Sequence, residues 1–314
     1  MIDQLYTERY RPGTLDDLIV PSRIKSELSK GATLNFLFHG PAGVGKTSAA
    51  KILSQGHEVK YIDVSTESSV DIVRTTIETF CSLTSFEHRG KVKIVLLDEF
   101  DGASEQFFKA LRGTIEKFEK TTRFIATCNY ISKIPAPMLD RFTVINFDLL
   151  NKEEEKEVKL SSAKKVKTIC EANGISIERD AIIQFVEMNF PSIRSMVKKI
   201  QSWKNREILE IKTSDIQILN YEFNDLYNMM FSDKSSYELK QFFQTNYSNK
   251  IDEVLVAFSN DFIEWLKLNK PDYLEKVLPI TIIETCKHQY QKRFVIDPLI
   301  VPLSLIFLIR SNLK

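Results

Sequence analysis

Cysteine is scarce in this chain, and the few cysteines are far apart. The 314 residues contain 4 of them, at Cys81, Cys128, Cys170 and Cys286. No two lie close enough to form a C-x-x-C pair, which argues against a zinc knuckle, and scattered thiols favour a reducing compartment. Glycine and proline are also few, with 10 residues each. This excludes a collagen-like or low-complexity chain.

The chain also lacks an excess of charge and a long apolar run. It has 43 Lys and Arg residues against 42 Asp and Glu residues, so a DNA-binding surface would have to be a local basic patch. The longest apolar stretch, LIVPLSLIFLIR, is too short to cross a bilayer and favours a buried helix. The N-terminal segment has no apolar core of a signal peptide. We therefore expect a cytoplasmic protein without a membrane partner.

The first half of the chain alternates short apolar runs with helical segments. The runs 34–39, 59–64, 92–97, 123–127 and 144–147 predict strands, and several are apolar on both faces. Such strands belong to a parallel sheet covered by helices, which predicts an α/β fold. After residue 149 the strand pattern ends, and 151–170, 179–189 and 192–205 predict helices. We predict three domains: an α/β domain over 1–149, a small helical lid over 150–218 and a helical C-terminal domain over 219–314.

A phosphate-binding loop occupies residues 40–47, which read GPAGVGKT between a predicted strand and a predicted helix. Glycines let the backbone approach oxygen anions, and the N–H groups of 43–47 point inward at a helix start that favours negative charge. Lys46 is expected to reach the β- and γ-phosphates, and the Thr47 hydroxyl to bind Mg²⁺. The motif predicts ATP and Mg²⁺ as cofactors, bound through Gly40, Gly43, Val44, Gly45, Lys46, Thr47 and Ser48.

A second motif, the acidic segment KIVLLDEFD, follows about fifty residues later. Its apolar run predicts a strand that ends at Asp98, which would lie beside the loop and hold Mg²⁺. Glu99 is then placed to orient and activate an attacking water. This arrangement favours ATP hydrolysis over transfer to a kinase substrate. The alternative is an exposed acidic turn at the end of a strand.

These motifs together resemble a known family. GPAGVGKT, LLDEFD and ALRGTIEKFEKTTRFIATCNYISKIPAPMLDRF are similar to the AAA+ ATPase subunits of sliding-clamp loaders, including the replication factor C small subunits and the large clamp-loader subunit of T-even-like bacteriophages. The opening TERYRPGTLDDLIVP resembles the family's N-terminal segment. The resemblance runs from about Thr7 to about Trp203. It implies an AAA+ P-loop domain, a helical lid and an all-helical collar that joins subunits.

The resemblance implies nucleotide contacts beyond the two motifs. Asn129 matches the sensor position that contacts the γ-phosphate and the attacking water. Arg194 matches the second sensor, which would contact the phosphates from the lid and tie lid closure to ATP. Arg9, Tyr10 and Ile19 match positions that line the adenine end of the pocket.

Arg141 falls where clamp loaders carry the arginine finger, which reaches the γ-phosphate of a neighbouring subunit and stabilises the transition state. The family's usual Ser-Arg-Cys is here Asp140-Arg141-Phe142. We expect Asp140 to pair with Arg141 when no neighbour is docked. A plain surface ion pair is the alternative to a role in the neighbouring site.

The resemblance also implies DNA contacts on the helices after the second and third strands. In the family these helices hold duplex phosphates, through contacts that are independent of sequence and sensitive to salt. The candidates are Ser68, Ser69, Arg74, Ser104, Lys109 and Arg112. The alternative for each of them is a solvated helix face.

The implied function is an ATPase subunit of a clamp loader. Such a subunit opens the processivity clamp of a DNA polymerase and loads it onto primer–template DNA, with hydrolysis at subunit interfaces. The expected partners are copies of itself and a distinct subunit in a pentamer, the sliding clamp and the DNA. Two alternatives stay open: another AAA+ DNA-remodelling ATPase of the branch-migration or origin-binding type, and a scaffold subunit without activity.

Overall fold

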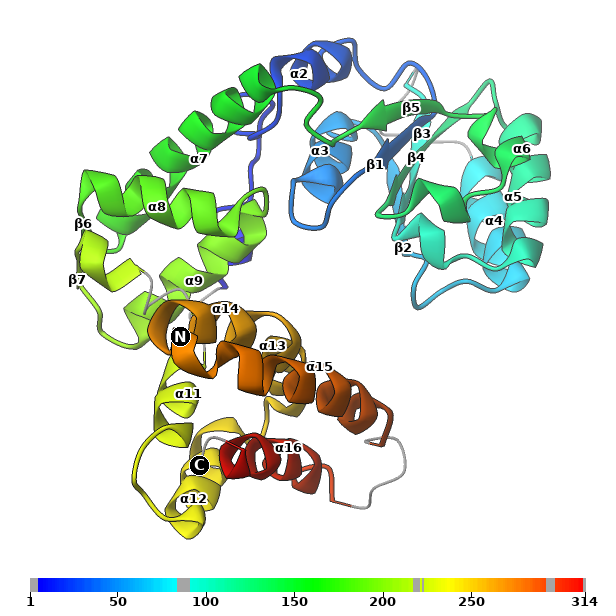
Figure 1. Cartoon of the computed structure of the whole chain (residues 1–314). Coiled ribbons are helices and arrows are strands. Elements are labelled where there is room, and N and C mark those ends of the chain that lie inside the picture. The colour runs from blue at the N-terminus through cyan, green and yellow to red at the C-terminus, as the bar shows by residue number, and fades with distance from the viewer. Residues whose placement is uncertain (1–4, 84–90, 217–220, 222, 292–296, 313–314) are drawn as a thin grey trace. The chain divides into compact units, whose positions relative to one another are not determined.

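The chain folds into two compact units. The computed structural model describes residues 5–83, 91–216, 221, 223–291 and 297–312. The first unit spans Met1–Ser214 and the second Asp215–Lys314 (Figure 1). The predicted boundary between 1–149 and 150–218 lies inside the first unit, so the division into three domains stays a prediction.

A five-stranded parallel sheet forms the centre of the first unit. The strands are β1 (Phe36–His39), β2 (Val59–Asp63), β3 (Lys93–Asp98), β4 (Thr122–Cys128) and β5 (Thr143–Asn146). Their order in the sheet is β2-β3-β4-β1-β5. All six residues of β3 are buried. The prediction of an α/β fold with a parallel sheet is confirmed, and each predicted strand is present to within two residues at either end.

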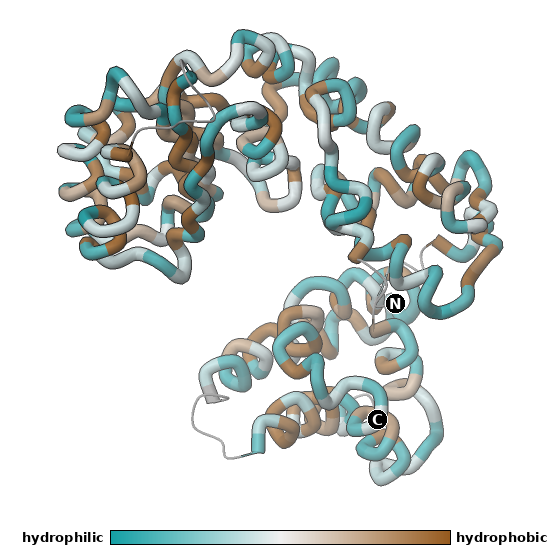
Figure 2. Tube along the Cα trace, turned by 180° about the vertical axis from the view of Figure 1, so that it is seen from behind, coloured by the Kyte–Doolittle hydropathy of each residue, from teal (hydrophilic) through white to brown (hydrophobic). Residues whose placement is uncertain are grey.

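Helices cover both faces of the sheet. Alternate residues of each strand point to opposite faces, so Leu37 and Val95 belong to one apolar cluster and Phe38 and Ile94 to another. The first cluster packs under η1 (Ile72–Ile77), α4 (Glu78–Ser82) and α5 (Glu105–Lys117), and the second under α2 (Ser22–Leu28) and α3 (Lys46–Leu53). Figure 2 shows hydrophobic residues concentrated along the strands between these helices. The short elements α1 (Tyr6–Arg9), η2 (Phe100–Gly102), η3 (Ile131–Lys133) and α6 (Ala136–Leu139) lie between the larger ones.

Three helices follow the sheet: α7 (Lys152–Ala172), α8 (Arg179–Asn189) and α9 (Ile193–Asn205). The Asn151 side chain accepts a hydrogen bond from the Glu154 N–H at 2.8 Å and caps α7. Gly174, at φ 70°, follows the end of this helix. The prediction that strands end after residue 149 is wrong in one detail. The two-residue strands β6 (Ser176–Ile177) and β7 (Glu210–Ile211) pair in parallel, and the 3-10 turn η4 (Thr213–Asp215) follows.

The regular elements described in the second unit are all helices. It contains α11 (Asn224–Met230), α12 (Ser236–Tyr247), α13 (Ile251–Ser259), α14 (Asp261–Asn269), η5 (Pro271–Tyr273), α15 (Leu274–Gln291) and α16 (Ile300–Ser311). Its core is rich in aromatic side chains, among them Tyr227, Phe243, Phe258, Phe262 and Trp265. The C-terminal apolar stretch forms the buried helix that was predicted. In the described part of the chain, no helix has the length and apolar character needed to cross a bilayer.

Candidate nucleotide-binding site

The phosphate-binding loop connects β1 to α3 in the way that the motif predicts. Gly43 and Gly45 adopt φ 80° and φ 100°, a region that favours glycine. Gly45 precedes the first residue of α3, so the backbone N–H groups of this helix start face the loop. A Cβ atom at Gly43 would lie only 2.2 Å from the Ser192 Oγ, because the start of α9 packs against the loop.

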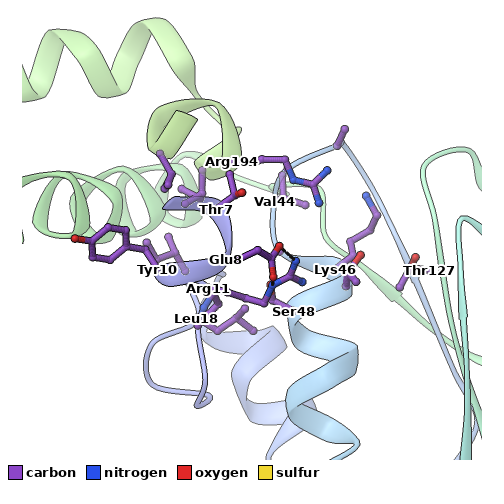
Figure 3. A pocket seen from close by; sticks show the side chains of 18 of the residues that line it. Thr7, Glu8, Tyr10, Arg11, Leu18, Val44, Lys46, Ser48, Thr127 and Arg194 are labelled. Atoms are coloured by element: carbon purple, nitrogen blue, oxygen red, sulfur yellow. Dashed lines mark hydrogen bonds and ion pairs between the residues drawn. The ribbon is translucent and has the colours of Figure 1, made fainter. Parts of the chain in front are cut away.

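A cavity of about 410 Å³ opens beside this loop. Its walls come from the loop, α1, the ends of β3 and β4, and the start of α9 (Figure 3). The residues of the sequence prediction that line it are Tyr10, Ile19, Gly43, Val44, Gly45, Lys46, Thr47, Ser48, Asp98, Glu99, Asn129 and Arg194. Three other residues predicted for the nucleotide site or its chemistry, Gly40, Arg9 and Arg141, do not line the cavity.

Lys46 lies at the floor of the cavity and is only 7% exposed. Its Nζ donates hydrogen bonds to the carbonyl oxygens of Gly40 at 2.8 Å and Pro41 at 2.7 Å, and to the Asn129 Oδ1 at 2.8 Å. Burial lowers the pKa of Lys46 from its ordinary value. Gly40 therefore contacts Lys46 through its carbonyl group, and Lys46 and Asn129 belong to one hydrogen-bonded cluster.

Asp98 accepts hydrogen bonds from three hydroxyl groups. Thr47 Oγ1 and Thr127 Oγ1 both donate to the Asp98 Oδ1, the former at 2.9 Å. The Tyr61 hydroxyl donates to the Asp98 Oδ2 at 2.9 Å. Sequence reasoning missed Tyr61 and Thr127, because they belong to β2 and β4, and only the sheet brings them to Asp98.

Glu99 has a strained backbone. Its φ of 53° places a side-chain-bearing residue in the left-handed region, directly after β3. The Glu99 N–H donates to the Thr127 Oγ1 at 3.4 Å, and the side chain is exposed at the cavity wall. This turn directs Glu99 away from the direction of the strand while Asp98 stays buried.

Asp101 holds the end of β4 in place. Its carboxylate accepts hydrogen bonds from the backbone N–H of Asn129 at 3.4 Å and of Tyr130 at 3.2 Å. The turn after β3 thereby fixes the residue whose amide contacts Lys46. Asp101 was also missed, although it lies in the acidic motif.

The helix α9 supplies one wall of the cavity. Ser192 caps α9 by accepting a hydrogen bond from the Ser195 N–H at 3.2 Å, and the Arg194 N–H donates to the Gly43 carbonyl at 3.4 Å. Figure 3 shows the Arg194 and Lys46 side chains, from α9 and α3, extending into the same space. Lys165 and Lys198 also line the cavity and add positive charge, which sequence reasoning did not predict.

The N-terminal segment is linked to the end of α7 through Tyr6 and Tyr10. The Asn173 side chain donates to the Tyr10 hydroxyl at 2.7 Å and accepts from the Tyr6 hydroxyl at 2.5 Å. Arg9 lies over the Tyr10 ring, with its Cζ 5.4 Å from the ring centroid. Of the three residues predicted for the adenine end, Tyr10 and Ile19 line the cavity, and Arg9 contacts it only through Tyr10.

The residues present fit a nucleoside triphosphate with Mg²⁺. Cationic side chains and the helix N–H groups provide the contacts that phosphates need. Thr47 and Asp98 offer the hard oxygen ligands that Mg²⁺ prefers. The described residues contain no cluster of three or more His, Cys, Asp or Glu side chains able to hold another metal ion.

Arg141 lies outside the cavity and is held by an acid on α5. Its Nε donates to the Glu116 Oε1 at 3.1 Å, its Nη2 contacts the same oxygen, and its Nη1 donates to the Pro137 carbonyl. The expected pairing with Asp140 is therefore corrected: the partner of Arg141 is Glu116. The hydrogen bond and charge of Arg141 hold the pKa of Glu116 below its usual range.

The candidate DNA contacts lie on η1, on α5 and in the turns before them. Arg74, Lys109 and Arg112 are exposed, and Lys109 pairs with Glu105 at 3.9 Å. Ser104 caps α5 by accepting from the Phe107 N–H at 3.2 Å, and its hydroxyl donates to the Ser68 carbonyl at 3.3 Å. Ser69 accepts from the Ile72 N–H at 3.4 Å. Their contact with DNA stays a prediction.

Comparisons with known proteins agree with the fold. Residues 36–149 match AAA, the ATPase family associated with various cellular activities. The replication factor C small subunit of Picrophilus torridus is 33% identical over 231 residues, covering 70% of each chain. Replication factor C subunit 4 of Caenorhabditis elegans is 34% identical, covering 63% of this chain and 62% of the relative. The sliding-clamp-loader large subunit of phage T4 is 28% identical, covering 86% and 78%.

Solved structures show the same fold. RuvB of Thermotoga maritima, a Holliday junction branch migration motor, superimposes with a TM-score of 0.52 at 17% identity, covering 75% of this chain and 84% of that one. Another RuvB structure, of a point mutant, gives the same TM-score at 16% identity, covering 76% and 88%. At this identity the likeness concerns the fold alone.

Proposed function

The chain belongs to the family of clamp-loader AAA+ ATPases that includes the replication factor C small subunits, and we propose that it is an ATP-hydrolysing subunit of a sliding-clamp loader. It opens the processivity clamp of a DNA polymerase and loads it onto primer–template DNA during replication. The observation that carries the proposal is one cavity holding Lys46, Thr47, Asp98 and Glu99 together, while Arg141 lies outside it.

The proposed reaction is attack of water on the γ-phosphorus of ATP. A bond forms to the water oxygen, the bond to the β-phosphate oxygen breaks, and ADP and inorganic phosphate are released. Lys46 exchanges its contacts with the loop carbonyls for the β- and γ-phosphates, and Arg194 contacts the phosphates from the lid. Glu99 takes the proton of the attacking water, and the Asn129 amide orients that water. Thr47 and Asp98 would hold Mg²⁺, which neutralises charge on the phosphates.

Assembly completes the site in this proposal. Arg141 exchanges Glu116 for the γ-phosphate of a neighbouring subunit and stabilises the charge of the transition state there. The proposed assembly is a pentamer of copies of this chain and a distinct subunit, joined through the helical second unit. Exposed apolar side chains on α15, namely Ile282, Ile283 and Tyr290, support a contact between subunits in that unit.

The fold of a branch-migration motor is the nearest alternative, since RuvB shares it. A motor of that kind is expected to carry a winged-helix domain, which contains strands. The described residues of the second unit form helices and contain no strand. This favours the clamp-loader proposal, in which the C-terminal part is an all-helical collar.

Substitution of Glu99 separates an active ATPase from a scaffold subunit. Glu99→Gln is expected to bind ATP as the natural protein does, while turnover in the assembled loader falls by about 10²-fold or more because the general base is lost. The measurement is steady-state ATPase with clamp and primed DNA, beside equilibrium binding of a fluorescent ATP analogue. Glu119→Gln, an exposed acid beyond the end of α5, is the matched control. Equal turnover in Glu99→Gln and the natural protein contradicts an active site here, and a lack of stimulation by clamp and DNA contradicts a role in clamp loading.

A further inference from the structure

Tyr61 reaches the buried acid of the site from the edge of the sheet. It lies in β2, opposite Leu96 of β3, so it approaches Asp98 from the neighbouring strand. Its hydroxyl donates to the Asp98 Oδ2 at 2.9 Å, while the residue is 45% exposed. Tyr61 is not among the residues that line the cavity, so it acts on the site only through Asp98.

Asp98 is fixed at both oxygens as a result. Its Oδ1 accepts from Thr47 and Thr127, and its Oδ2 accepts from Tyr61, while the residue is 9% exposed. A buried carboxylate is stable only when its oxygens are hydrogen-bonded. Anchoring at Oδ2 prevents rotation of the carboxylate and keeps Oδ1 turned toward Thr47.

This orientation determines what the Thr47 hydroxyl offers. Because the Thr47 hydroxyl donates a hydrogen bond to Asp98, the lone pairs of its oxygen can face a cation in the cavity. Partners of this kind, which orient the ligands of a metal without touching it, tune its affinity strongly. We propose that Tyr61 is a positioning residue of the magnesium site and that its hydroxyl sets the affinity for the divalent cation that accompanies the nucleotide.

The ring of Tyr61 makes a contact that does not depend on its hydroxyl group. The Lys51 Nζ lies 5.5 Å from the centroid of the ring. Replacement by phenylalanine removes the hydroxyl and keeps this ring contact, which makes Tyr61→Phe a clean test.

The experiment measures how tightly Mn²⁺, as a probe for Mg²⁺, binds to the full chain in the presence of a non-hydrolysable ATP analogue. It compares the natural protein with Tyr61→Phe. Free Mn²⁺ is followed by electron paramagnetic resonance. Tyr61→Phe is expected to weaken Mn²⁺ binding about tenfold, while affinity for the analogue without metal stays unchanged. ATPase of the assembled loader is expected to recover when Mg²⁺ is raised. Tyr237→Phe, which removes an exposed hydroxyl in the second unit, is the control.

This inference rests on the proposed function, and the experiment distinguishes failure of the Tyr61 role from failure of that function. If the natural protein binds Mn²⁺ with the analogue and Tyr61→Phe binds it equally well, the role of Tyr61 is overturned while the proposed function stands. A lower melting temperature with unchanged Mn²⁺ affinity shows a structural role only and also overturns it. If the natural protein does not bind the analogue at all, the proposed function fails and this inference fails with it.

Discussion

At the residue scale, the ion pair between Glu116 and Arg141 competes with the proposed contact between subunits. Both side chains lie on the surface of the first unit, and the Arg141 guanidinium is already bonded to Glu116. Exposed ion pairs of this kind are screened by solvent and contribute little to stability. The pair therefore opposes docking of Arg141 on a neighbour only weakly.

Glu116→Gln is expected to raise the clamp- and DNA-stimulated ATPase by a few-fold at most, because Arg141 is no longer held by a full charge. Activity of the isolated subunit and its thermal stability should stay the same. Steady-state rates at two salt concentrations check this, since salt weakens the natural pair and should narrow the difference. A fall in stimulated activity would show instead that Glu116 orients Arg141 productively.

The residues of the site divide according to how far apart they lie in the sequence. The phosphate-binding loop was predictable because Gly43, Gly45 and Lys46 carry their geometry in one local segment. Tyr61 and Thr127 were not, because a tyrosine or threonine in a strand has no signal until the register of the sheet places it beside Asp98. Glu116 was missed for the same reason, since α5 meets Arg141 only in the fold.

At the scale of elements, the start of α5 has one observed role, the helix cap, and one proposed role, contact with DNA. Ser104 caps the helix through the Phe107 N–H, and it is also a candidate for contact with a DNA phosphate. The two roles respond differently to substitution, because an aspartate caps a helix about as well as serine but adds a negative charge.

Ser104→Ala is therefore expected to lower the free energy of unfolding by about 1 kcal/mol, whereas Ser104→Asp should leave it nearly unchanged. If the start of α5 contacts DNA, Ser104→Asp should weaken binding of primed DNA by the assembled loader, most at low salt. Chemical denaturation and fluorescence anisotropy measure the two effects. Unchanged DNA affinity in Ser104→Asp contradicts contact at this position.

Element prediction succeeded where burial left a strong pattern. Strands β3 and β4 are buried on nearly all residues, so their apolar runs stood out from the sequence. The helix α7 carried its own cap at Asn151 and its own end at Gly174. The pair β6 and β7 was missed because two residues are too few for any periodicity.

At the scale of the whole molecule, the cavity and the proposed collar belong to different units. Every residue that lines the cavity lies between Thr7 and Lys198, within the first unit. The proposed collar is the second unit, for which the sequence predicted helical character and a buried C-terminal helix. The arrangement of subunits in the proposed loader could not be predicted from the sequence, because exposed apolar side chains do not specify their partner.

The central claim is that ATP is bound at Lys46 in one copy and hydrolysed when an adjacent copy supplies Arg141. The most direct measurement is steady-state ATPase of loaders assembled with natural or Arg141→Ala subunits, in the presence of clamp and primed DNA. The account predicts that Arg141→Ala subunits bind ATP normally and assemble, while turnover falls by about 10³-fold. Unchanged turnover in the Arg141→Ala assembly, or full activity of the isolated natural subunit, would contradict the account.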